Sequence, residues 1–179
     1  PENQVFGSGT VLDTARMRYL ISLETGTAVQ NIHGYIAGEH GDSEVPLWSS
    51  TEIGGVPITQ WGTTLDGGVF DESKRERIAH DVVRSAYRII EGKGATNYAV
   101  GLAVQRIIGA VLNDEQRVLT ISPLLNSWHG ISDVCMAVPT IVGREGAGRR
   151  LELPLTSDEK ERLTASADHL REVARGLGY

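Results

Sequence analysis

Cysteine, long apolar runs and signal-like termini are scarce or absent in this chain, and each scarcity excludes a class of protein. Among 179 residues there is a single cysteine, Cys135, so no internal disulfide can form. Such cysteine use is typical of a reducing compartment, and we expect a cytoplasmic protein. No apolar run reaches the ~20 residues that span a bilayer, and the first residues resemble no signal peptide. We therefore expect no membrane partner.

Positive charge is also in short supply. The chain has 17 lysine and arginine residues against 23 aspartate and glutamate residues, a formal net charge of −6. This balance disfavours nucleic acid as the main partner. The hydrophobic content of 40% and the charged content of 22% are those of a globular domain. The length suffices for one domain with a substantial core.

Apolar periodicity and turn residues predict four helices and a set of short strands. We expect helices over residues 11–24, 71–91, 97–112 and 157–177. We expect extended segments over residues 32–38, 45–50, 53–59, 117–124 and 133–142. Because helices and strands are segregated along the chain, the order favours an α+β fold with a mostly antiparallel sheet over a doubly wound parallel sheet.

The same patterns predict which side chains are buried. The first helix carries an apolar stripe made of Leu12, Ala15, Tyr19 and Leu23. The helix over residues 97–112 is apolar nearly all round, so we expect it to be buried. Cys135 lies in an apolar run and is expected to be a buried structural residue. Three histidines are expected to be structural or solvated: His80, His129 and His169.

Glycine-rich segments suggest nucleotide sites, but neither fits. Gly7–Gly9 precedes a helix as in a dinucleotide fingerprint, yet no strand comes before it and Leu12 occupies the third glycine position. Gly143–Arg150 has the spacing of a P-loop but lacks the Lys-Ser/Thr pair that contacts phosphate and magnesium. We interpret it as a turn between strands. No histidine, cysteine or carboxylate pair has the sequence spacing of metal ligands, so we expect no metal site.

The most informative stretch is Gly38–Pro46, which reads Gly-Glu-His-Gly-Asp-Ser-Glu-Val-Pro. Gly38 precedes the Glu39–His40 pair and Gly41 follows it. These glycines allow a sharp bend of the backbone and keep bulky side chains away from His40. A histidine held there has an ordinary pKa near ~6.5, which suits proton transfer at neutral pH. Taken alone, the motif is equally consistent with a solvated histidine in a tight turn.

Two charged residues of the first helix change that balance. Asp13 and Arg16 lie about 60° apart around a helix, on one face. They could be no more than a surface ion pair worth a few tenths of a kcal/mol. With His40, however, they form a set with a chemical logic. The aspartate would orient the imidazole, the histidine would exchange a proton with a carbonyl or alcohol oxygen, and the arginine would bind a carboxylate through two hydrogen bonds. This set predicts a site for a 2-oxo or 2-hydroxy acid.

Several segments together resemble the bacterial, allosteric type of L-lactate dehydrogenase. The segments are Gly7–Arg16, Gly38–Pro46, Gly94–Ala99, Gly130–Asp133 and Val138–Thr140. They occur in the order that the family has, and the similarity covers essentially the whole chain. It is a similarity to the C-terminal, substrate-binding domain of the lactate/malate dehydrogenase family.

The resemblance implies a role for each of four residues. His40 is the proton donor and acceptor, and Asp13 orients it. Arg16 binds the substrate carboxylate, and Thr96 lines the pocket near the substrate side chain. The resemblance also implies NAD as cofactor, held by a Rossmann domain with a mobile catalytic loop. We expect that domain to precede Pro1, since nothing in this chain is similar to it.

A second resemblance concerns Arg18 and His33. Arg18 lies about 160° from Arg16 around the helix, and His33 starts the strand that leads to His40. The pair resembles half of a fructose 1,6-bisphosphate site built across a subunit interface, which implies a homotetramer regulated by this effector. The alternative is an exposed arginine and a strand histidine with no relation to each other.

Other functions stay open at this point. Malate dehydrogenase shares the fold and the roles of the aspartate, arginine and histidine, and 2-hydroxyisocaproate dehydrogenase differs mainly in pocket volume. Glu39, Ser43 and Thr96 favour lactate. An alternative of a different class is a non-catalytic module for oligomerisation or effector binding.

Overall fold

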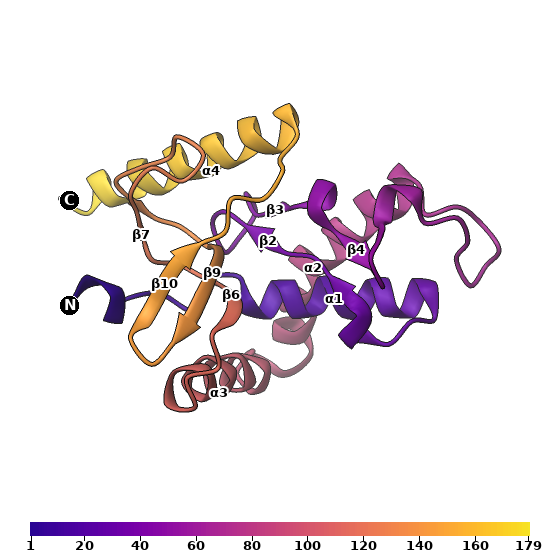
Figure 1. Ribbon diagram of the computed structural model, residues 1–179, viewed down its shortest axis with the longest axis horizontal. Helices are drawn as coiled ribbons and strands as arrows, with labels where there is room; N and C mark the ends of the chain where they lie inside the picture. The colour runs from indigo at the N-terminus through magenta and orange to yellow at the C-terminus, as the bar shows by residue number, and fades with distance from the viewer.

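Helix α1 is the centre of the molecule. The computed structural model describes residues 1–179 and contains four α-helices. They are α1 (Val11–Thr25), α2 (Glu72–Lys93), α3 (Tyr98–Leu112) and α4 (Ser157–Gly176). Figure 1 shows α1 crossing the middle of the molecule, with α4 along one edge and α3 along the opposite edge. Because α1 contacts α2, α3 and strands on two sides, residues at its amino end can take part in more than one packing layer.

The strands are short, and every pairing between them is antiparallel. They are β1 (Ile32–His33), β2 (Ile36–Ala37), β3 (Val45–Pro46), β4 (Glu52–Ile53), β5 (Val56–Pro57), β6 (Arg117–Ile121), β7 (Leu124–Leu125), β8 (Val134–Cys135), β9 (Val138–Gly143) and β10 (Gly146–Arg150). The sheets have the orders β1-β4-β5, β10-β9-β6, β2-β3 and β7-β8. The α+β prediction with antiparallel sheet is confirmed.

Three apolar clusters form the core. One joins α1 to α2 and to β1 and β4 around Met17 and Ile21. A second joins the start of α1 to α3, β6 and β9 around Ile107 and Val142. The third lies under α4 around Leu125 and Leu163. The loop between β2 and β3 begins and ends on strands that are buried in these clusters, so its ends are fixed.

The expected strand over residues 32–38 is broken in two at Gly34. A Cβ atom on Gly34 would lie 2.8 Å from side-chain atoms of Met17 and of Thr51, so a larger residue at this position would force these side chains to shift. Two segments that were expected to be extended also contain short 3-10 helices, Trp48–Ser50 and Ile58–Gln60. The hydroxyl of Thr51 donates to the Leu47 carbonyl (2.8 Å), a local bond that competes with strand pairing.

The predicted apolar stripe of α1 is wrong. The buried residues are Val11, Asp13, Thr14, Met17 and Ile21, whereas Tyr19 is 56% exposed and Leu23 54%. The side of α1 that packs inward includes polar side chains that form hydrogen bonds with other elements. The Thr14 hydroxyl accepts a hydrogen bond from the Ile36 amide (3.0 Å) and shares one with Thr120 (3.0 Å). These bonds tie α1 to β2 and β6, and this orientation leaves the other apolar side exposed.

The predicted burial of α3 and of Cys135 is also wrong. On α3 only Ala103, Ile107 and Ala110 are buried, and Leu102 is 69% exposed. One side of α3 packs on β9 and on the start of α1, and the apolar residues on its outer side are exposed. Cys135 is exposed because alternation in the strand points it outward while its neighbours on both sides are buried.

The expected turn after residue 142 and the expected exposure of His80 and His169 are confirmed. Residues 143–146 form the turn of the β9–β10 hairpin. Thr156 and Glu159 form a reciprocal capping box at the start of α4. The side chains of His80 and His169 are largely exposed. No helix of the structure has both the length and the apolar character needed to cross a membrane.

Candidate active site

The loop between β2 and β3, residues 38–44, holds His40 in place. Gly38 has a φ of 98°, a conformation that favours glycine, and exchanges backbone hydrogen bonds with Ala137 (2.9 and 3.1 Å). The Ser166 hydroxyl of α4 accepts a hydrogen bond from the Glu39 amide (2.8 Å) and shares one with the Ser43 hydroxyl (3.0 Å). The loop is therefore anchored by the sheet at its start and by α4 along its length.

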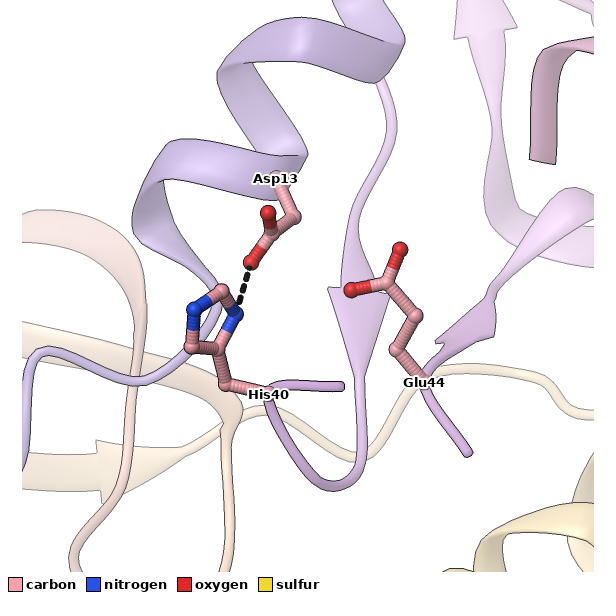
Figure 2. A group of neighbouring side chains, drawn as sticks. All are labelled: Asp13, His40 and Glu44. Carbon is pink, nitrogen blue, oxygen red and sulfur yellow. Dashed lines mark hydrogen bonds and ion pairs between the residues drawn. The ribbon is translucent and has the colours of Figure 1, made fainter. Parts of the chain in front are cut away.

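His40 and Asp13 form the hydrogen bond that the sequence predicts. Nδ1 of His40 lies 2.7 Å from Oδ2 of Asp13, and because a carboxylate can only accept, Nδ1 carries the proton. Asp13 is 2% exposed, whereas the side chain of His40 is 59% exposed. Figure 2 shows Nε2 on the ring edge remote from Asp13. Asp13 thus fixes the tautomer and orientation of a histidine whose other nitrogen faces outward.

The surroundings of His40 favour its protonated form. The hydrogen bond to Asp13 is the main cause that raises the pKa of His40, and the negative charges of Asp13 and Glu44 act in the same direction. Partial burial and the positive charge of Arg16 oppose the rise in pKa. The net effect is an imidazole that retains its proton to higher pH than a free histidine does, as a proton donor at neutral pH requires.

Arg16 lies on the same face of α1 as Asp13, as predicted. Its Nη1 donates to Oδ1 of Asp13 (3.1 Å), and its side chain is only 13% exposed. Its Nη2 is buried and has no hydrogen-bond partner. A buried donor without a partner is unfavourable unless an acceptor can reach it. Arg16 therefore has a free donor suited to a carboxylate beside the Asp13–His40 pair.

Glu44 is a member of the site that the sequence reasoning did not identify. It is 6% exposed, and its Oε1 has no hydrogen-bond partner. Burial is the main cause that raises the pKa of Glu44 to about 8, and the charge of Asp13 adds to it, while His40 and Arg16 act against it. Figure 2 shows its carboxylate turned back toward the Asp13–His40 pair. The signal in the sequence was a glutamate directly before the buried strand β3.

The side chains of Asp13, His40 and Glu44 form a group that could be taken for a metal site. One side-chain atom from each of Asp13, His40 and Glu44 lies within 4.8 Å of the others. The sequence spacing could not show this grouping, because the residues come from α1 and from a distant loop. A cation among these atoms would have to displace the 2.7 Å hydrogen bond between Asp13 and His40, so we assign none of the three as a metal ligand.

The other predicted site residues lie apart from this group. Thr96 is half-buried in the link between α2 and α3, and its side chain makes no hydrogen bond to Asp13, Arg16 or His40. Its predicted contact with substrate stays a prediction.

Arg18 and His33 lie on the other side of α1. The Nε atom of Arg18 donates to the Gly34 carbonyl (2.9 Å), and its guanidinium lies 5.1 Å from the centre of the Tyr35 ring. Burial lowers the pKa of Arg18 from its ordinary value. His33 is exposed on β1, one residue before Gly34. Arg18 and His33 are therefore both placed at the break between β1 and β2.

Comparison with known proteins decides the family. Residues 10–176 match the family model described as lactate/malate dehydrogenase, alpha/beta C-terminal domain. The chain belongs to this family. The resemblance noted in the sequence and the fold class are thereby confirmed.

Several relatives of the chain carry the name L-lactate dehydrogenase. The chain is 51% identical over its whole length to an L-lactate dehydrogenase of Bifidobacterium animalis subsp. lactis, and covers 56% of that protein. It is 50% identical to one from Treponema denticola, with 95% of this chain and 54% of the relative aligned. The chain thus spans about half the length of the curated relatives it matches.

Solved structures agree with the sequence relatives. The minor L-lactate dehydrogenase of Enterococcus mundtii superposes with a TM-score of 0.91 at 40% identity, over 97% of this chain and 55% of that one. A lactate dehydrogenase from a Medee basin deep-sea metagenome library superposes with a TM-score of 0.94 at 38% identity, over 100% of this chain and 57% of that one.

Proposed function

We propose that this chain is the C-terminal, substrate-binding domain of an NAD-dependent L-lactate dehydrogenase that interconverts pyruvate and (S)-lactate. The observation that carries the proposal is the 2.7 Å hydrogen bond between buried Asp13 and exposed His40, next to an arginine with an unpartnered buried nitrogen. The names of the relatives, which are L-lactate dehydrogenases, support the choice of substrate.

The chain itself offers no cradle for a dinucleotide. A Cβ atom on Gly9 would lie 2.3 Å from the Thr120 carbonyl oxygen, so the Gly7–Gly9 segment packs against β6 and cannot approach a pyrophosphate. We therefore place NAD in a Rossmann domain outside this chain. When bound there, NAD takes up or supplies the hydride at C2 of the substrate.

The proton chemistry belongs to residues of this chain. In pyruvate reduction, Nε2–H of His40 donates its proton to the ketone oxygen, and His40 becomes neutral. Asp13 keeps Nδ1 protonated, so that only Nε2 exchanges its proton. Arg16 binds the substrate carboxylate and orients the ketone toward His40. Before transfer, the positive charge of His40 stabilises the negative charge that develops on the substrate oxygen. Lactate oxidation runs through the same groups in reverse.

The proposal includes regulation by fructose 1,6-bisphosphate and a homotetrameric, cytoplasmic enzyme. Arg18 and His33 would supply half of the effector site, and a second copy of the chain across a two-fold axis would supply the other half. Two such pairs would bring together positive groups that can bind two phosphates. In support, Arg18 is held by Gly34 and Tyr35, next to exposed His33, on the side of α1 that faces away from the active site.

Steady-state kinetics of the full-length protein tests this function. With NADH as donor, pyruvate is expected to give a kcat/KM at least about tenfold above that of oxaloacetate or 2-oxoisocaproate, and fructose 1,6-bisphosphate is expected to raise it. A preference for oxaloacetate would make the protein a malate dehydrogenase, and a preference for 2-oxoisocaproate would make it a 2-hydroxyisocaproate dehydrogenase. Failure to oxidise NADH with any of them would favour the non-catalytic module. The 179-residue chain alone is expected neither to bind NADH nor to oxidise lactate.

A further inference from the structure

Glu44 lies behind the catalytic pair without a bond to either member. A carboxylate oxygen of Glu44 lies within 4.8 Å of side-chain atoms of Asp13 and of His40. No hydrogen bond or ion pair connects Glu44 to either residue. It is 6% exposed, and Oε1 lacks a partner. The side chain of Arg16 donates a hydrogen bond to Asp13 and forms no ion pair with Glu44. A buried glutamate that bonds to neither Asp13 nor His40 although it lies beside both is a candidate for a functional role.

An ionised Glu44 would be costly in this environment. A buried carboxylate with an unsatisfied oxygen loses solvation that no hydrogen bond replaces, and a second carboxylate, Asp13, stands beside it. A neutral carboxyl avoids both penalties, which agrees with the rise of the Glu44 pKa to about 8. Glu44 is therefore, besides His40, a second group whose pKa is raised next to the single carboxylate of Asp13.

The titrations of these two groups are coupled by charge. When Glu44 releases its proton at alkaline pH, its negative charge favours the imidazolium form of His40, and protonated His40 in turn favours ionised Glu44. Each group thus changes the pH at which the other titrates. The charged groups that face the pair are Asp13 and Arg16 from α1 and Asp42 from the same loop.

We propose that Glu44 is a positioning residue for the proton-transfer step: its buried carboxyl, once it ionises at alkaline pH beside the Asp13–His40 pair, keeps His40 protonated to higher pH than Asp13 alone would. This inference rests on the proposed function, in which protonated His40 is the form that reduces pyruvate. Glu44 touches neither substrate nor NAD in this role and acts only through His40.

The experiment compares Glu44→Gln with Asp42→Asn in the full-length enzyme. Glu44→Gln removes the negative charge that Glu44 acquires at alkaline pH, and Asp42→Asn removes a negative charge from the same loop. Asp42 is exposed, so its charge is screened by solvent. The measurement is kcat/KM for pyruvate from about pH 6 to pH 10. The alkaline midpoint is expected to fall by about 0.5 to 1 pH unit in Glu44→Gln and to stay within about 0.2 unit in Asp42→Asn. Glu44→Asp, which keeps a titratable group farther from His40, is expected to give an intermediate midpoint.

A second readout does not depend on turnover. NMR titration of the His40 ring in the full-length protein without substrate is expected to show the same downward shift in Glu44→Gln. An unchanged or raised midpoint in both measurements would overturn the role of Glu44. Should Glu44→Gln fail to fold, the Glu44→Asp profile decides, and a wild-type profile there would also overturn it. Full turnover in a His40→Ala enzyme would instead overturn the proposed function, so the two failures are distinguishable.

Discussion

The two sides of α1 differ in how complete they are within one chain. On the side of Asp13 and Arg16, the hydrogen bonds that orient His40 and Arg16 are already formed. On the side of Arg18, the guanidinium binds a backbone carbonyl and an aromatic ring, and the nearby His33 is exposed. The first side has its proton-transfer group oriented within one chain, whereas the proposed effector site on the other side needs a second copy of the chain.

This difference follows from what each side must do. A proton donor has to be oriented before substrate arrives, so its partner Asp13 is buried and fixed. A receptor for a bisphosphate gains regulatory value when its positive groups come together only with a second subunit, because their repulsion then depends on assembly and effector. The predictions below test the two sides separately.

Among the substitutions on α1, the largest effect is expected from Asp13→Asn. The amide would no longer favour protonated His40 and could hold the ring in the wrong tautomer, so kcat for pyruvate in the full-length enzyme should fall about 10²- to 10⁴-fold. Asp42→Asn on the exposed part of the loop is the matched control and should retain most activity. A loss of less than about fivefold in Asp13→Asn would mean that Asp13 does not orient His40.

Substitution of Arg16 should affect substrate binding. Lysine keeps the charge but loses the two-pronged geometry, so the KM for pyruvate is expected to rise about 10- to 100-fold in Arg16→Lys. Arg18→Lys, the same change on the opposite side of α1, should leave this KM within about twofold. The comparison would break down if both variants raised the KM equally or if Arg16→Lys left it unchanged.

The catalytic side should also make stability depend on pH. Because the pKa of Glu44 rises from 4.5 to about 8 on folding, the folded chain holds a proton that the unfolded chain has released between these values. The free energy of unfolding therefore falls as pH rises through this window. Relative to its value at pH 5, the wild type should lose roughly 3 kcal/mol more than Glu44→Gln by pH 8. Urea unfolding of both at pH 5 and pH 8 measures this difference, and parallel curves would show that Glu44 does not hold the proton.

The smallest effect on basal chemistry is expected on the Arg18 side. Arg18→Gln should change turnover without effector by less than about twofold, yet abolish activation by fructose 1,6-bisphosphate, because a charge-assisted contact to phosphate is lost. Arg84→Gln on the exposed surface of α2 controls for the loss of one positive charge. Normal activation of Arg18→Gln would remove Arg18 from the effector site.

Sequence reasoning succeeded where the signal was local. Helical periodicity placed Asp13 and Arg16 on one face, and the glycines around His40 indicated a turn that presents the ring. The four helices and the antiparallel sheet also followed from turn and capping residues such as Thr156. Each of these features depends on neighbours a few residues away.

The errors arose where burial depends on distant partners. Helix α1 is apolar on two sides, and the buried side is the one that carries Thr14, which bonds to β2 and β6, and Met17 and Ile21, which pack in the core. The outer side of α3 is apolar without being covered by this chain. Glu44 looked like one acidic residue in a charged loop, because its place behind Asp13 is visible only once the loop has folded onto α1.

The central claim is that His40 donates the proton, and one substitution tests it most directly. In the full-length enzyme, His40→Ala should lower pyruvate reduction by at least about 10³-fold while NADH binding, followed by its fluorescence, stays intact. His169→Ala, an exposed histidine on α4, should retain wild-type turnover. Turnover of His40→Ala within about tenfold of the wild type would contradict the assignment of His40 and, with it, the proposed chemistry of the site.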